Sequence, residues 1–324
     1  MSEPGVRSDG AVRRSDCAPR TNLAPADQPR PPPLAPPRGL ASPRGGPTSP
    51  PRTNLARVPT ERRIPRVLSI AGSDSGGGAG IQADLKALAA CGVYGMTAIT
   101  AITAQNTVGV SAIHTVPPET IIAQVRAVAS DIGVDAVKIG MLGTVATIEA
   151  VAAALDELPP GTPVVLDPVM VAESGAELLE PSARRQLVDL LVPKATVITP
   201  NIPEARLLAG LVDAEPEELA RALLELGPAA VVVTGGHREQ AIDVFFDGSQ
   251  LAQLPGERQA DGAAHGSGCT HSSALAAGLA WGLEPLEAAR LAREVAARAV
   301  ERGLVEIGAG AGPVDVLGLA GRLP

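Results

Sequence analysis

The chain has 324 residues, a formal net charge of −8 and aromatic side chains at 1% of its positions. The acidic balance argues against nucleic acid as the main ligand, because that ligand selects basic surfaces. Three cysteines in a chain of this length form no disulfide framework, which predicts a reducing, cytoplasmic location. Charges, glycines or prolines interrupt every apolar run, so we expect neither a membrane span nor a membrane partner.

The first 63 residues differ in composition from the rest of the chain. They hold 14 of the 31 prolines and eleven arginines against five acidic residues, so this segment carries +6 and the remainder −14. We predict a disordered basic tail, because such sequence builds neither helices nor central strands. It fits neither a secretory signal nor an amphipathic transit peptide. A dispensable extension, an upstream start codon and an arm that contacts nucleic acid or membrane all stay open.

Short β-rich runs alternate with alanine- and leucine-rich helical patterns from residue 66 onward. Strands are predicted at 67–71, 96–104, 136–139, 164–167, 196–199, 230–234 and 241–246. Helices are predicted at 79–91, 118–132, 144–158, 182–191, 202–209, 216–226, 269–282 and 285–302. Several strands are apolar throughout, which is typical of a parallel sheet with helices on both faces. Residues 64–324 are therefore predicted to form one doubly wound α/β domain with ligands at the carboxyl ends of its strands.

Glycine-rich and polar segments follow the first two predicted strands. The loop 72–80 has five glycines but lacks the Gly-Lys-Ser/Thr of a P-loop, and Gln105 stands where a dinucleotide fingerprint has an acid. Such a loop suits either close backbone approach to a ligand or simple flexibility. The Gln105 amide offers a donor and an acceptor, which suits the edge of a nitrogen heterocycle, although a plain polar loop residue is the alternative.

The next strands also end in residues that are candidates for binding or catalysis. Met141 is either a soft apolar wall for a flat ring or part of the core. Asp167 leaves the end of its strand, and Asn201 and Glu204 lie three apart at a helix start. Oxygen ligands in that arrangement suit Mg²⁺ bridging to phosphates, with an ordinary N-cap as the alternative for Asn201. The glycines after Thr234 predict another tight backbone approach.

The segment 265–270, His-Gly-Ser-Gly-Cys-Thr, runs from a glycine turn into an alanine-rich helix. Unpaired N–H groups and the helix dipole at such a start favour an anion such as phosphate. A thiol at a helix N-terminus tends to have a lowered pKa, so Cys269 is a candidate proton acceptor. The alternative is a small buried hydrophobic residue.

Six segments in this order, at 72–86, 104–107, 138–141, 167–170, 199–205 and 265–270, resemble hydroxymethylpyrimidine/phosphomethylpyrimidine kinases of thiamine biosynthesis. The resemblance runs from about residue 66 to 316 and implies the three-layer α/β/α ribokinase-like fold with a mostly parallel central sheet. It implies ATP-dependent phosphorylation of 4-amino-5-hydroxymethyl-2-methylpyrimidine and then of its monophosphate, with Mg²⁺, in a homodimer. A pyridoxine/pyridoxal kinase of the same fold and a non-catalytic pyrimidine or nucleotide sensor are the alternatives.

The resemblance also implies roles for individual residues. Cys269 matches the general base, and Gly266 and Gly268 supply the anion hole. The pyrimidine pocket is implied to comprise Gly72, Ala79, Asp84, Thr103, Gln105, Met141 and Val169. The nucleotide phosphates and Mg²⁺ are assigned to Asp167, Asn201, Glu204, Thr234 and Gly236, with Asp167 and Glu204 as the metal ligands. Thr234 stands where many members carry a lysine.

Overall fold

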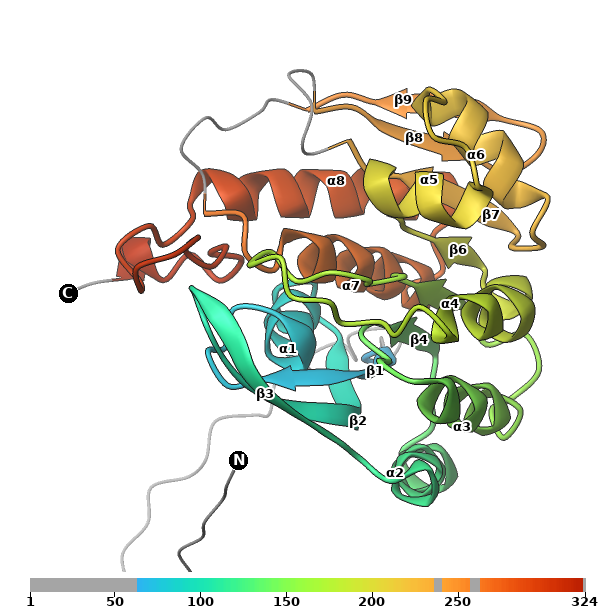
Figure 1. The fold of residues 1–324 in the computed structure, drawn as a ribbon, viewed down its shortest axis with the longest axis horizontal. Helices are drawn as coiled ribbons and strands as arrows, with labels where there is room; N and C mark the ends of the chain where they lie inside the picture. The colour runs from blue at the N-terminus through green and yellow to red at the C-terminus, as the bar shows by residue number, and fades with distance from the viewer. Residues whose placement is uncertain (1–62, 236–240, 257–262, 323–324) are drawn as a thin grey trace, which may run out of the picture. The chain divides into compact units, whose positions relative to one another are not determined.

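The computed structural model describes residues 63–235, 241–256 and 263–322. Residues 1–62 of the predicted tail, and Gly236, lie outside these ranges. Within them, the strands form one nine-stranded sheet in the order β3-β2-β1-β4-β5-β6-β7-β8-β9 (Figure 1). The strands are β1 (Arg66–Asp74), β2 (Tyr94–Asn106), β3 (Gly109–Thr115), β4 (Ala136–Ile139), β5 (Val164–Leu166), β6 (Val197–Ile198), β7 (Ala230–Val233), β8 (Asp243–Phe246) and β9 (Leu251–Leu254).

The sheet is parallel in its middle and antiparallel at both edges. Strands β2, β1, β4, β5, β6 and β7 run parallel, whereas β3, β8 and β9 pair antiparallel. The chain moves outward from β1 to β3, and then resumes at β4 on the other side of β1. The strand order therefore reverses between β1 and β4, and the segments that leave the ends of these two strands diverge to opposite sides. Such a switch point is where open α/β sheets bind ligands.

Helices cover both faces of the sheet, as expected for a three-layer fold (Figure 1). One core lies under α2 (Pro118–Asp131), α3 (Val145–Leu155), α4 (Ala183–Gln186), α5 (Ile202–Ala209) and α6 (Pro216–Leu224). The other lies under α1 (Gly80–Ala90), α7 (Ser267–Ala280) and α8 (Pro285–Glu301). Val231 and Val233 of β7 enter the first core and Val232 enters the second. Burial on both faces explains why this strand is apolar throughout.

Several elements differ from the sequence prediction in existence, type or boundary. Strands β3 and β9 were not predicted; β3 is largely exposed, and β9 lies at the opposite edge. The helix predicted at 182–191 is the short α4 followed by a π-helical turn at Leu187–Leu191. Helix α7 begins at Ser267, two residues before the predicted start. Among the described residues, no helix is long and apolar enough to cross a bilayer.

Candidate active site

A cavity of about 420 Å³ lies where the carboxyl ends of the parallel strands meet the start of α7. Segments distant in sequence converge here, because the ends of neighbouring parallel strands share one edge of the sheet. The cavity brings together most of the residues singled out from the sequence: Gly72, Ala79, Thr103, Gln105, Met141, Asp167, Val169, Asn201, Glu204, Thr234, Gly266, Gly268 and Cys269.

Asp84 is the exception, because it does not line the cavity where the pyrimidine was expected to contact it. The side chain is fully buried on α1, behind the cavity wall. Its carboxylate accepts hydrogen bonds from Ser69 Oγ at 2.6 Å, Lys138 Nζ at 2.8 Å and Ser273 Oγ at 2.9 Å. Because these three donors occupy the carboxylate, Asp84 anchors the wall and leaves none of its surface to a ligand.

Lys138 lines the cavity, although no role was predicted for it from the sequence. Its side chain is fully buried on β4, in an ion pair with Asp84. Burial opposes the charge of this ammonium, but the negative charge of Asp84 and its hydrogen bond raise the pKa of Lys138 above the ordinary value. A buried ion pair therefore lies beside the cavity. The available sequence signal was a lysine within the otherwise apolar strand 136–139.

The turn before α7 requires glycine at position 266. Gly266 has a left-handed φ of 85°, and a Cβ there would lie 1.9 Å from the carbonyl oxygen of Gly78. At Gly268 an added Cβ would lie 4.0 Å from Asp167 Oδ2. The turn thus packs directly against the loop 72–80. This close approach places the unpaired N–H groups of the first turn of α7 at the cavity.

The loop 72–80 is held in place by Asp74 and His265. The Asp74 carboxylate accepts hydrogen bonds from the backbone N–H groups of Gly76, Gly78 and Ala79, at 2.7 to 3.1 Å. His265 Nε2 lies 3.2 Å from Asp74 Oδ2. Burial acts to raise the pKa of Asp74, but His265 and these N–H donors hold it below its usual value. These contacts give the glycine loop a defined conformation at the wall of the cavity.

The environment of Cys269 corrects the expectation of a lowered pKa. Burial of the thiol raises the pKa of Cys269 to about 12. The Lys138 ammonium and the N–H of Gly80 act to lower it, whereas the Asp84 and Asp167 carboxylates raise it further. In the ligand-free cavity, desolvation thus outweighs the position at a helix N-terminus. The thiol keeps its proton at neutral pH unless a bound ligand changes these charges.

Asn201 and Glu204 form a capping box at the start of α5. Asn201 Oδ1 accepts the N–H of Glu204 at 2.9 Å, and Glu204 Oε2 accepts the N–H of Asn201 at 3.0 Å. Glu204 Oε1 also accepts the N–H of Met170 at 3.3 Å. Asn201 is therefore an N-cap, as its alternative interpretation proposed. The same contacts fix the Glu204 carboxylate against the cavity.

Asp167 and Glu204 are buried carboxylates that disfavour each other's ionisation. Burial, together with the charge of Asp167, raises the pKa of Glu204 to about 8. Burial likewise raises the pKa of Asp167, whose carboxylate accepts a hydrogen bond from Ser272 Oγ at 3.0 Å. Two such oxygen ligands fit a divalent cation that keeps water and phosphate in its remaining positions. Within the described ranges, no three acidic, histidine or cysteine side chains gather for a metal.

A third polar cluster, Asp243, His271 and Arg293, lines the cavity and was not predicted. Asp243 Oδ1 accepts the N–H of Gly235 at 2.9 Å, just after Thr234. His271 Nε2 lies 3.4 Å and Arg293 Nη1 3.7 Å from the Asp243 carboxylate. Burial acts to raise the pKa of Asp243, but His271 and Arg293 hold it below its usual value. No short motif marks these residues, because β8, α7 and α8 each contribute one of them.

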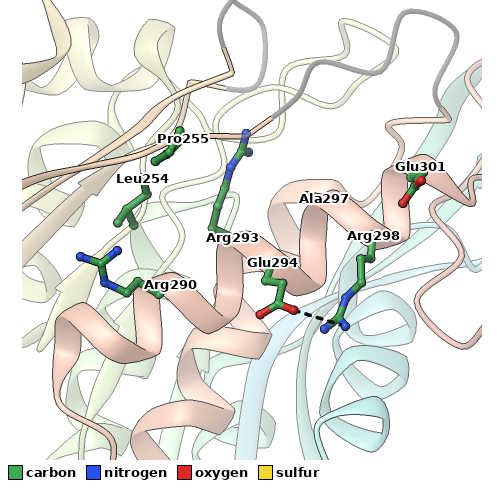
Figure 2. A pocket seen from close by; sticks show the side chains of 8 residues that line it. All are labelled: Leu254, Pro255, Arg290, Arg293, Glu294, Ala297, Arg298 and Glu301. Atoms are coloured by element: carbon green, nitrogen blue, oxygen red, sulfur yellow. Dashed lines mark ion pairs between the residues drawn. The ribbon is translucent and has the colours of Figure 1, made fainter.

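A second pocket, of about 480 Å³, lies on α8 and the end of β9 (Figure 2). Its lining includes Arg290, Arg293 and Arg298, which project from α8. Each guanidinium already has a carboxylate nearby: Glu287 at 3.4 Å, Asp243 at 3.7 Å and Glu294 at 3.4 Å, respectively. These pairs offset the positive charge, so the pocket presents no strong anion site.

Comparison with known proteins connects this geometry to one group of kinases. A family model described as phosphomethylpyrimidine kinase matches residues 74–315. The hydroxymethylpyrimidine/phosphomethylpyrimidine kinase of Rhizobium meliloti is 50% identical over 256 residues, which cover 76% of this chain and 95% of that one.

Two solved structures are also similar. The phosphomethylpyrimidine kinase of Clostridium difficile has a TM-score of 0.63 and 42% identity, with coverage of 72% of this chain and 97% of that one. A Bacillus subtilis pyridoxal kinase in complex with ADP has a TM-score of 0.72 and 40% identity, with coverage of 80% and 99%.

Proposed function

The chain belongs to the phosphomethylpyrimidine kinase family, and we propose that it transfers the γ-phosphoryl group of ATP to 4-amino-5-hydroxymethyl-2-methylpyrimidine and then to the resulting monophosphate. The observation that carries the proposal is one cavity that holds the Gln105 amide, the Cys269 thiol and the glycine turn before α7. The fold alone is insufficient, because a pyridoxal kinase shares it at 40% identity.

The pyrimidine ring is proposed to bind between the loop 72–80 and the ends of β2, β4 and β5. Met141 and Val169 supply apolar surface there, and Gly72 and Ala79 supply backbone. Gln105 is proposed to read the polar edge of the ring through its amide donor and acceptor. The described part of the chain has aromatic side chains at 94, 245, 246 and 281, none of which lines the cavity, so stacking on several aromatic rings plays no part.

The phosphates are proposed to bind at the start of α7. The N–H groups of Gly268 and Cys269 and the helix dipole stabilise negative charge on the transferred group. Lys138, in its buried ion pair with Asp84, lines the same cavity. Thr234 and the glycines after it are proposed to contact the nucleotide, although Gly236 lies outside the described residues. These groups together suit a reaction that depends mainly on positioning and on charge stabilisation.

Asp167 and Glu204 are proposed to hold Mg²⁺, with Asn201 fixing Glu204 through the capping box. The ion would neutralise charge on the ATP phosphates. Before it binds, the Glu204 carboxyl must release its proton, because its pKa is about 8. Asp167 stays oriented through its hydrogen bond from Ser272.

Cys269 is proposed to accept the proton of the substrate hydroxyl. The hydroxyl oxygen forms a bond to the γ-phosphorus, the bond from that phosphorus to the β-γ bridging oxygen breaks, and the thiolate takes the proton. The thiolate form is scarce in the ligand-free cavity, and Lys138 is the side chain that favours it. Ligand binding must therefore lower the pKa of Cys269 before the thiolate can take the proton.

Release of ADP with three acceptors tests the proposed function. Purified protein with Mg-ATP should turn over the hydroxymethylpyrimidine and its monophosphate faster than pyridoxal. Equal or greater kcat/KM on pyridoxal would assign the chain to the pyridoxal kinases instead. If none of the acceptors were phosphorylated while ligands still bound, the protein would be a sensor.

We also propose where the chain acts and how it is organised. The chain acts in the cytoplasm as a homodimer without nucleic acid or membrane partners, and residues 64–324 form the kinase domain. The cysteine content and the acidic charge support the location and the absence of nucleic acid. Residues 1–63 form a basic tail that takes no part in catalysis.

A further inference from the structure

Gln105 lies at an irregularity of the sheet where its backbone is held from outside the ladder. The pairing of β2 with β3 shifts register between Ala104 and Gln105. Ser75, in the glycine loop, replaces the lost ladder contacts: its Oγ donates to the Gln105 carbonyl oxygen at 2.7 Å and accepts the Gln105 N–H at 2.8 Å. The loop therefore fixes the position from which the Gln105 side chain reaches the cavity.

The side chain of Gln105 is held by Thr103, two residues earlier on the same face of β2. Thr103 is buried, and its Oγ1 lies 3.0 Å from the Ser73 carbonyl oxygen and 3.0 Å from Gln105 Oε1. A hydroxyl carries one proton and can donate to only one of these two oxygens at a time. An amide in the opposite orientation removes the conflict, because its Nε2 donates to Oγ1 while Oγ1 donates to Ser73.

Ser73 is a firm acceptor for this network. It lies where the pairing of β1 with β2 changes register, and its own Oγ accepts a hydrogen bond from Gln82 Nε2 at 2.8 Å. Gln82 Oε1 in turn accepts the N–H of Asp74 at 3.0 Å. The Ser73 carbonyl is thus fixed by neighbours on both β1 and α1, and it gives the Thr103 proton a defined direction.

We infer that Thr103 is a specificity-determining positioning residue that fixes which end of the Gln105 amide faces the substrate. The Thr103 hydroxyl donates to Ser73 and accepts from Gln105 Nε2. Oε1 and the remaining N–H then form the edge that meets the ligand. The inference rests on the proposed function, because it assigns Gln105 to the acceptor ring.

This orientation distinguishes two kinds of heterocycle. A 4-aminopyrimidine offers an exocyclic N–H donor beside a ring-nitrogen acceptor, which complements the Oε1 and N–H of the fixed amide. Pyridoxal has an aldehyde oxygen on the carbon next to the one that bears the reacting group, and this acceptor would face Oε1. A freely rotating amide could turn to suit either ring, so the discrimination depends on the Thr103 hydroxyl.

Thr103→Val and Thr103→Ser test the inference, since valine keeps the shape and serine keeps the hydroxyl. We expect valine to lower kcat/KM for the aminopyrimidine about tenfold, which is the value of one well-placed hydrogen bond. The kcat/KM for pyridoxal should stay the same or increase. Serine should restore most of the ratio between the two substrates. Dissociation constants of both ligands, from calorimetry, should follow the same pattern.

The possible outcomes separate the inference from the proposed function. An equal loss on both substrates, or an unchanged ratio in the valine variant, would overturn the role of Thr103. Wild-type protein that binds the aminopyrimidine without phosphorylating it would overturn the function alone, because the binding ratio still reports on the amide. Wild-type protein that fails to bind the aminopyrimidine would overturn both.

Discussion

Cys269 lies among charges of both signs, so its protonation is set by what else occupies the cavity. Burial and the carboxylates of Asp84 and Asp167 favour the thiol, whereas Lys138 favours the thiolate. Because the pKa is about 12, the thiolate fraction increases about tenfold for each unit by which the pH rises toward that value. The base role therefore makes a prediction about pH as well as about mutation.

At saturating Mg-ATP, kcat/KM for the hydroxymethylpyrimidine should rise from pH 7 to pH 9. Cys269→Ala should lower turnover about a hundred- to ten-thousandfold and abolish the rise, because a general base contributes that much. Nucleotide affinity, measured by calorimetry, should change little, since the N–H groups of α7 remain. A variant with wild-type turnover would exclude Cys269 as the base.

Glu204 predicts a separate pH dependence, in the affinity for magnesium. Because its pKa is about 8, the Glu204 carboxyl holds a proton at pH 7, and this proton competes with the cation for the carboxylate. The apparent magnesium affinity should therefore increase as the pH rises from 6.5 to 8.5, in titrations at fixed ATP. Glu204→Gln should weaken the affinity and flatten this dependence, while an unaltered profile in the variant would remove Glu204 from the metal site.

Single residues mark the limit of what the sequence could show. The residues at strand ends, such as Gln105 and Asp167, could be predicted because a parallel sheet places its carboxyl ends together. The ion pair of Asp84 could not be predicted, because its partner Lys138 is 54 positions away and only the packed fold brings the two together. The pKa of Cys269 was likewise mispredicted, since a helix start is visible in sequence but burial is not.

The glycine turn at the start of helix α7 supports both the fold and the proposed anion site. Gly266→Ala would force alanine into a left-handed conformation and against the carbonyl of Gly78. We expect a loss of about 1–3 kcal/mol in the free energy of unfolding from the strained backbone, and a raised KM for ATP. Urea unfolding and steady-state kinetics would measure the two effects.

Gly268→Ala is the matched control for this prediction. Its added Cβ meets only Asp167 Oδ2, at 4.0 Å, and its φ lies outside the left-handed region. Stability should stay close to wild type. Equal destabilisation by both substitutions would show that the close approach at Gly266 is not what shapes the turn.

Elements with strong patterns were predictable, and elements at the sheet edges were not. Strand β7 is apolar at every position because helices cover both its faces. Strand β3 is an antiparallel edge strand with mostly exposed residues, so neither alternation nor a continuous apolar run marks it. The turn at Leu187–Leu191 keeps a helical pattern in sequence, and its wider π-helical hydrogen bonding leaves no trace there.

At the scale of the whole molecule, the family match and the sheet both lie within the part of the chain after the basic tail. We therefore expect a chain that begins at residue 61 to keep the kcat/KM and the melting temperature of the full chain. Activity and thermal unfolding of the two proteins, at matched ionic strength, would be compared. A severalfold loss of activity in the shorter chain would mean that the tail contributes to catalysis.

One cavity is proposed to perform two successive phosphorylations on the same pyrimidine. Phosphorus-31 NMR of a reaction that contains the protein, Mg-ATP and 4-amino-5-hydroxymethyl-2-methylpyrimidine tests it most directly. We expect the monophosphate to appear first and then to be converted to the diphosphate, with one ADP released at each step. A spectrum in which the pyrimidine stays unphosphorylated, while pyridoxal added in its place is phosphorylated, would contradict it.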